Sequence, residues 1–242
     1  MNIDDMQLVK NMASWIGDLN GGNKVLILAR YEHIAKTNVI LLKALLEGLK
    51  KNGIFVSIDR PHKYMEHLLR MHKVDYSELA FLDTIAAYSA DQFNIGNTTN
   101  NVKILDSPFQ IHLLPEMFSL NSITGDGMES RIDVSYVDFI LIDNIASMLN
   151  YNDFAMVETF LENYLNSLPL ANNILIPVVL DSRTHESLYN VAKRLVDYEI
   201  VVDGMGQDKT GFDNEGKKRS LLSEKKSFMD LYSYRKCITG GD

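Results

Sequence analysis

Residues Val25–Thr37 read VLILARYEHIAKT, an apolar run followed by polar residues and then by a helical pattern. A strand is predicted at Lys24–Ala29, because its consecutive apolar residues indicate burial on both faces. Strands of this kind are typical of parallel sheets covered by helices. Residues 30–35 are predicted to form a loop, and a helix is predicted at 36–52, where Gly53 provides the stop.

Apolar strands and amphipathic helices alternate along the rest of the chain. The gaps between strands are long enough for crossover connections, so the alternation predicts an α/β fold with a mainly parallel sheet flanked by helices. The most distinct strands are VDFILID at Val137–Asp143 and ILIPVVL at Ile174–Leu180, although Pro177 disfavours full pairing in a central strand. Further strands are predicted at 54–59, 79–82, 102–105 and 199–202, helices at 3–18, 61–73, 110–120, 153–167 and 184–197, and loops at 87–101 and 121–135.

Composition restricts the class of protein. The 242 residues are 46% hydrophobic and 23% charged, as in globular proteins with a buried core. A net charge of −8 argues against a general nucleic-acid-binding protein, which carries a basic surface. Cys237 is the only cysteine, so a reducing compartment is expected. The chain shows neither a signal peptide nor an apolar run of roughly 20 residues, so a cytoplasmic protein without membrane contact is expected.

The predicted loop ends in Lys36-Thr37, the pair that closes a phosphate-binding loop. Such a loop reads G-x-x-x-x-G-K-[ST], and its glycines let backbone N–H groups approach phosphate oxygens. Arg30 and Ala35 occupy the two glycine positions here, and the Arg30 side chain can fill the phosphate volume itself. The pattern indicates a nucleotide-binding architecture with a filled-in cradle. An ordinary first helical turn containing Lys and Thr remains the alternative.

With these elements in place, the chain resembles the RecA-fold ATPases of the archaeal KaiC/RadA-like type. VLILARYEHIAKTNVILLKALLEGLKKNG resembles the Walker A strand, loop and helix of that family, and VDFILIDNIASML resembles its Walker B strand. IFVSIDRP, ILIPVVLDS and EIVVDG resemble its other strands, and KKRSLLSEKKS with YRKCITGG resembles its terminal hairpin. The resemblance implies one RecA-like P-loop NTPase-type domain at 1–203, with a basic hairpin or flexible tail at 204–242. Residues 84–135 match nothing specific.

The resemblance also implies roles for individual residues. Lys36 stands at the Walker A lysine position, and Thr37 and Asp143 stand at the two positions that hold Mg²⁺. Asp59 stands where the family usually has a catalytic Glu, and its side chain is one methylene shorter. Mg-ATP is therefore the implied cofactor, with Arg30 and Ala35 in the loop around it. Lys225 and Lys226 lie near the position of the family's trans-acting basic pair.

The departures from the family pattern decide the expected function. Missing loop glycines impair phosphate binding, and the shorter Asp59 reaches an attacking water less easily, so catalysis is expected to be lost. We expect a non-catalytic regulatory or assembly partner that acts through another protein or through self-association. Met12 and Trp15 mark the N-terminal helix as a candidate interface, although core packing explains them equally well. The alternative function is a weak ATP-binding protein or slow ATPase.

Three further features have two interpretations each. The basic residues at 216–236 are interleaved with aromatic residues, which favours contact with single-stranded DNA, as expected of a recombination accessory, but a solvated hairpin is the simpler explanation. His62 and Glu66 are one helical turn apart and could begin a metal site, but the partners are missing and a solvated helix surface is expected. Asp59 and Arg60 are expected to form a local ion pair, and Asp143 is expected to hold the residues that follow it.

Overall fold

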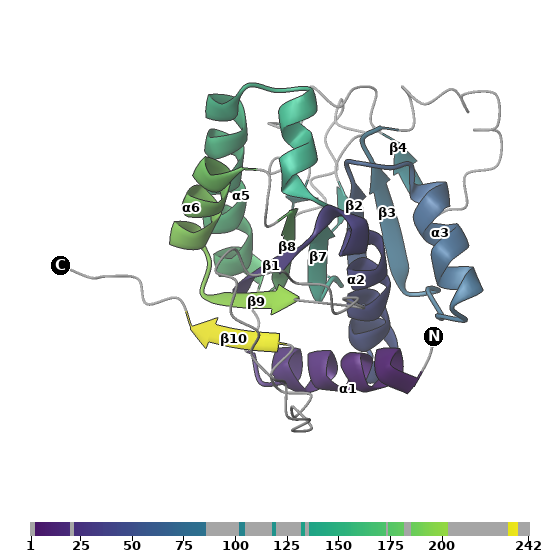
Figure 1. Ribbon diagram of the computed structural model, residues 1–242. Coiled ribbons are helices and arrows are strands. Elements are labelled where there is room, and N and C mark those ends of the chain that lie inside the picture. Colours follow the sequence, from purple (N-terminus) through teal and green to yellow (C-terminus); the bar gives the residue numbers. More distant parts are fainter. Residues whose placement is uncertain are drawn as a thin grey trace, which may run out of the picture.

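A computed structural model describes residues 3–19, 22–85, 102–104, 118–119, 132–133, 136–172, 174–181, 185–202 and 232–236 (Figure 1). The helical segments are α1 (Ile3–Gly17), α2 (Tyr31–Lys43), the π-helical turn η1 (Ala44–Gly48), α3 (His62–Met71), the 3₁₀ helix η5 (Ile145–Asn150), α5 (Phe154–Asn172) and α6 (Glu186–Leu195). The strands are β1 (Lys24–Ala29), β2 (Gly53–Ser57), β3 (Leu79–Asp83), β4 (Val102–Ile104), β5 (Phe118–Ser119), β6 (Ile132–Asp133), β7 (Phe139–Ile142), β8 (Ile176–Asp181), β9 (Tyr198–Val202) and β10 (Tyr232–Lys236).

The described strands form an eight-stranded sheet in the order β10-β9-β1-β8-β7-β2-β3-β4, with β5 and β6 paired separately. Every neighbouring pair in the large sheet is parallel except β10 and β9, which are antiparallel. Strand β8 lies between β1 and β7, so the two strands that the family resemblance singled out are separated by one strand. The predicted α/β fold, with a mainly parallel sheet flanked by helices, is confirmed.

The sheet separates two hydrophobic cores because alternate residues of each strand point to opposite faces. Leu26 and Leu28 of β1 pack into the core covered by α5 and α6, whereas Val25 and Ile27 pack into the core covered by α1, α2 and α3 (Figure 1). Phe160 and Tyr164 are the largest side chains of the first core and stack with ring centroids 5.3 Å apart. Burial on both faces explains why β1, β7 and β8 read as continuous apolar runs.

Pro177 lies inside the central strand β8 and interrupts its pairing on one side. The N–H of Leu175 donates to the Asp138 carbonyl (2.9 Å), and the next N–H, that of Ile176, donates to the Asn23 carbonyl on the opposite side (3.0 Å). By this alternation the Pro177 nitrogen faces β7, and it has no hydrogen to donate. Strands β7 and β8 accordingly pair only at separated positions, whereas β1 and β8 pair along the whole of β1. The expected effect of Pro177 is confirmed for the β7 side.

Gly53 allows β2 to begin against an aromatic ring of β7. A Cβ atom at this position would lie 2.1 Å from Cζ of Phe139, whose ring is fully buried. No side chain larger than hydrogen fits there without moving the ring, so the close approach of these strands requires glycine.

Several predictions about elements differ from the structure. The loop predicted at 121–135 includes the short strand β6, and Gly53, predicted as a helix stop, is the first residue of β2. Helix α5 continues through Pro169 to Asn172 instead of ending before the proline. The predicted helix at 110–120 is described only at Phe118–Ser119, which form the short strand β5. Most importantly, α2 begins at Tyr31 and not at the predicted position 36.

Several expectations concern residues outside the described part of the chain. The loop predicted at 87–101 and most of the tail at 204–242 lie there, and only β10 of the tail is described. Among the described residues, no helix has the length and apolar character needed to cross a bilayer.

Candidate functional site at the carboxyl edge of the sheet

The segment predicted as a phosphate-binding loop is the first part of helix α2. Arg30 is the N-cap residue with extended backbone (φ −71°, ψ 148°), and helical conformation begins at the next residue, Tyr31. The His33 N–H already donates to the Arg30 carbonyl at 2.8 Å. The expectation of a loop at 30–35 is therefore wrong. Without glycine nothing favours the positive φ angles of a phosphate loop, and the backbone adopts the α-helical region instead.

The Lys36 side chain pairs with a residue of α1. Its Nζ atom forms an ion pair with Oδ1 of Asp5 at 2.6 Å, which ties α2 to α1. The neighbouring Thr37 is buried, and its Oγ1 has no hydrogen-bond partner in the described part of the chain. Ala35, one residue before Lys36, is half-buried in the same helix. The side chain that contacts Asp143 belongs to Asn38, a residue that the sequence pattern did not single out.

Asp143 follows the last residue of β7 and is only 4% exposed. Asn38 Nδ2 donates to Oδ1 of Asp143 at 2.5 Å, and the backbone N–H of Asp143 donates to the Val56 carbonyl at 3.1 Å. Burial raises the pKa of the Asp143 carboxyl to about 7; the Asn38 hydrogen bond acts in the opposite direction, Asp59 adds to the increase and Arg60 opposes it. Asp143 can therefore gain or lose a proton near neutral pH.

A chain of hydrogen bonds connects the end of β7 with the end of β2. Asn144 adopts a left-handed backbone (φ 51°) and donates from Nδ2 to the Ser147 hydroxyl at 2.9 Å. The Ser147 hydroxyl donates to Oδ1 of Asp59 at 2.9 Å, and Oδ2 of Asp59 forms an ion pair with Nε of Arg60 at 3.4 Å. The expected Asp59–Arg60 ion pair is thus confirmed, and both carboxylate oxygens of Asp59 have partners.

Arg60 lies over the rings of two tyrosines. Its guanidinium carbon is 4.9 Å from the ring centroid of Tyr64 and 5.7 Å from that of Tyr31. Burial lowers the pKa of Arg60, but the Tyr31 hydrogen bond and the nearby Tyr64 and Asp59 raise it by more, so Arg60 stays a cation. The signal that could have identified this cluster is that Tyr31, Arg60 and Tyr64 all follow predicted strands, whose carboxyl ends share one edge of a parallel sheet.

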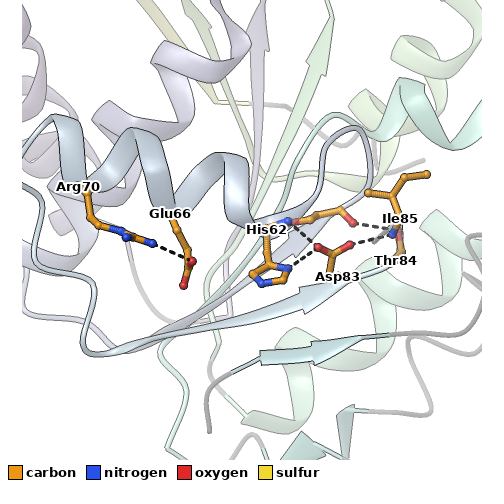
Figure 2. Close-up of polar contacts among 7 residues, drawn as sticks. His62, Glu66, Arg70, Asp83, Thr84 and Ile85 are labelled. Carbon is orange, nitrogen blue, oxygen red and sulfur yellow. Dashed lines mark hydrogen bonds and ion pairs between the residues drawn. The ribbon is translucent and has the colours of Figure 1, made fainter. Parts of the chain in front are cut away.

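The same edge carries a second buried cluster at the end of β3 (Figure 2). Oδ2 of Asp83 accepts hydrogen bonds from the backbone N–H of His62 (2.5 Å) and pairs with its Nδ1 (2.6 Å), and Oδ1 accepts from the Ile85 N–H (2.9 Å). Asp83 thereby caps α3 from a neighbouring strand, because the N-cap residue Pro61 provides no side-chain hydrogen bond.

This cluster corrects the interpretation of His62 as a solvated surface residue. His62 is only 5% exposed. Glu66, the partner considered for a metal site, pairs instead with Arg70 at 3.2 Å (Figure 2). In the described ranges no group of three or more His, Cys, Asp or Glu side chains could hold a metal ion. The pair of His62 and Asp83 is therefore best explained as a structural cap.

Some predicted site residues lie outside the described structure or are described only as backbone. Lys217, Lys218, Arg219, Lys225 and Lys226 belong to the first group. Arg235 and Lys236 belong to β10, which adds an antiparallel strand to the edge formed by β9. The geometry of the basic segment at 216–236 therefore stays a prediction.

Comparison with known proteins identifies a fold and no family. No family model matches the chain, and no curated protein matches it. Among solved structures, the uncharacterized protein PH0321 from Pyrococcus horikoshii, in complex with an unknown peptide, has a TM-score of 0.56 and 15% identity over 81% of this chain and 84% of that one. The KaiC-like protein PH0186 from the hyperthermophilic archaeon Pyrococcus horikoshii OT3 has a TM-score of 0.47 and 14% identity over 75% of this chain and 71% of that one.

Identities this low show the fold alone, and fold does not determine function. The strand order and the likeness to the PH0321 structure agree with the expected α/β fold, a mainly parallel sheet flanked by helices. At the carboxyl edge of the sheet, α2 lies where a loop was expected. Asn38 donates a hydrogen bond to Asp143, and Arg60 pairs with Asp59.

Proposed function

We propose that this chain is a non-catalytic protein with a RecA-like fold that regulates or assembles with other proteins, among them copies of itself. The start of α2 at Tyr31 carries the proposal. A phosphate loop exposes several consecutive N–H groups, whereas N–H groups beyond the first turn of a helix are bonded along the helix. The ion pair between Lys36 and Asp5 supports the same view, because the amine expected to bind phosphate is paired with a carboxylate of α1.

Calorimetric titration of Mg-ATP tests this proposal directly. The parent chain, Lys36→Ala and a control variant of an exposed lysine of α1, Lys10→Ala, should all give only the heat of dilution. Binding that is present in the parent and in Lys10→Ala but absent in Lys36→Ala would overturn the proposal. It would mean that Lys36 leaves Asp5 and that the first turns of α2 rearrange around phosphate.

A weak ATP-binding protein or slow ATPase is the second candidate, with Mg²⁺ held by Thr37 and Asp143. Two observations favour it: Asp143 lies at the carboxyl end of a parallel strand, and Thr37 Oγ1 is buried without a partner in the described part of the chain. The same titration decides between the two candidates. Phosphate release above the level of an Asp143→Asn variant would identify the slow ATPase.

Contact with another protein has two forms, which hydrodynamic measurements separate. In sedimentation velocity, self-association should appear as a weight-average sedimentation coefficient that increases with protein concentration. A constant coefficient would direct the search to a different protein. The solved structure of PH0321 holds an unknown peptide, and peptide binding is the form of contact that we propose for this chain.

Contact with single-stranded DNA through residues 216–236 is a separate proposal with its own test. A salt-dependent mobility shift that disappears when residues 216–242 are deleted would support it, because phosphate contacts weaken as salt increases. The absence of a shift at low salt would eliminate it. The net charge of −8 favours the second result.

A further inference from the structure

We propose that Tyr31, Arg60 and Tyr64, here called the Arg60 clamp, bind an aspartate or glutamate side chain of an acidic segment in a partner protein. The inference rests on the proposed function and names the chemistry of the partner that it requires. The clamp lies where β1 and β2 end, since Tyr31 begins α2 two residues after β1 and Arg60 follows β2 by three residues.

The clamp combines an accessible surface with a cation. Tyr31 is 49% exposed and Tyr64 is 39% exposed, while the Arg60 side chain is 30% exposed between them. The two centroid distances, 5.7 Å and 4.9 Å, place the guanidinium within cation–π range of both rings. Arginine and tyrosine are the residue types that concentrate binding energy in protein interfaces.

The guanidinium is oriented before any partner arrives. Its Nε atom pairs with Oδ2 of Asp59, and Oδ1 of Asp59 is held by the Ser147 hydroxyl. Asn144 donates in turn to that hydroxyl. A guanidinium carries five N–H donors, so after the Nε pair with Asp59 and the hydrogen bond with Tyr31, further N–H groups on the terminal nitrogens can donate to a carboxylate. A preoriented side chain loses less conformational entropy on binding than a free one.

Charge favours a carboxylate over a nucleic acid. The clamp presents one guanidinium, and the carboxyl groups of Asp59 and Asp143 lie close to it. Arg30, which follows β1 at this edge, has Nη1 at 3.8 Å from Oε1 of Glu32. A single carboxylate matches a single guanidinium, whereas a phosphodiester backbone carries a negative charge at every nucleotide. The N-terminus of α2 has no side-chain cap, so its dipole adds a further attraction for an anion.

Fluorescently labelled peptides test the proposal. A set of short peptides containing Asp and Glu is compared with the same set carrying Asn and Gln, and with oligothymidylate of similar length. Full-length parent chain should prefer the acidic set by about tenfold, as expected for a charge-assisted bidentate contact. Arg60→Lys keeps the charge but removes the guanidinium, and it should lose most of this preference. Tyr64→Ala should weaken binding of the acidic set.

Two matched variants control for general effects of charge and of aromatic surface. Arg70→Lys changes a 66% exposed arginine of α3 that pairs with Glu66 (Figure 2), and Tyr136→Ala removes an 80% exposed tyrosine before β7, at the opposite edge of the sheet. Both should retain the preference of the parent. Circular dichroism and thermal unfolding of all four variants identify any loss of fold.

The outcomes separate this inference from the proposed function. Equal binding of the acidic and amide peptides, no binding of either, or a preference that survives in Arg60→Lys overturns the clamp as a carboxylate site. Binding of oligothymidylate that depends on Arg60 overturns it in favour of nucleic acid. None of these results bears on the proposed non-catalytic role, which Lys36-dependent binding of Mg-ATP or Asp143-dependent release of phosphate would overturn.

Discussion

At the scale of single residues, Asp143 illustrates how a neutral amide changes the chemistry of a buried acid. Its side-chain partner is Asn38, whose Nδ2 donates to Oδ1 at 2.5 Å and acts to lower the pKa of the carboxyl. Burial outweighs the hydrogen bond, and the pKa of Asp143 rises to about 7. The consequence is a proton equilibrium at the edge of the sheet that depends on tertiary packing.

Asp143 should make the protein less stable as pH rises from about 4 to about 7. Its folded pKa of about 7 lies above the ordinary value of 3.8, so between these two values the folded state binds more protons than the unfolded state. Raising the pH in this range therefore favours the unfolded state. Urea unfolding at a series of pH values should show this decrease in the parent and a smaller decrease in Asp143→Asn. An exposed control, Asp18→Asn, should follow the parent. Equal slopes for all three proteins would show that Asp143 titrates as an ordinary acid.

At the scale of elements, α2 is defined by what precedes it and by what covers it. Strand β1 leads into the helix with only Arg30 between them, and α1 lies across α2 in Figure 1. The ion pair between Asp5 and Lys36 joins the two helices beside apolar contacts of Leu8, Val9 and Met12. Met12 is only 2% exposed, so its expected alternative role in core packing is the one that the structure supports.

The ion pair between Asp5 and Lys36 should contribute measurably to the stability of the pair of helices. Lys36→Ala and Asp5→Ala should each lower the unfolding free energy, and a double-mutant cycle should give a coupling energy of roughly 0.5–1 kcal/mol, because the pair is only partly shielded from water. Unfolding in urea at low and high salt provides the measurement. A coupling energy of zero would indicate that Lys36 is free to serve another partner.

In the molecule as a whole, one sheet contains strands from near both ends of the chain, β1 and β10. Strand β10 pairs with β9 from Tyr232↔Val202 to Lys236↔Tyr198, so part of the tail at 204–242 completes the edge of the domain. An uncovered β9 would present unpaired N–H and C=O groups, which favour aggregation. The division of the chain at residue 203 therefore stays a prediction that truncation can test.

Removal of residues 204–242 should lower stability by roughly 1–3 kcal/mol through loss of the β9–β10 hydrogen bonds, and should promote aggregation. Removal of residues 237–242 alone leaves β10 intact and should have little effect. Chemical unfolding and light scattering of both truncated chains are the measurements. Unchanged stability of the chain that lacks residues 204–242 would show that the tail does not contribute to the stability of the domain.

Local pattern was sufficient for the buried central strands of the large sheet. The boundaries of β1 at Lys24–Ala29 are those predicted, because a strand buried on both faces needs consecutive apolar residues whatever surrounds it. The effect of Pro177 was also predictable, since a missing N–H is a property of the residue itself. The ion pair of Asp59 with Arg60 follows from their adjacency.

The site depended on contacts that the sequence does not encode locally. Helix α2 begins before Lys36 because no glycine opposes it and because α1 and the sheet bury its apolar face. His62 of α3 is buried against Asp83 of β3, whose carboxylate accepts the His62 backbone N–H and pairs with its Nδ1 atom. Hydrophobic periodicity along the chain is enough to predict the α/β fold. Which polar groups meet depends on the folded structure, because hydrogen bonds between residues distant in the chain depend on strand order and register.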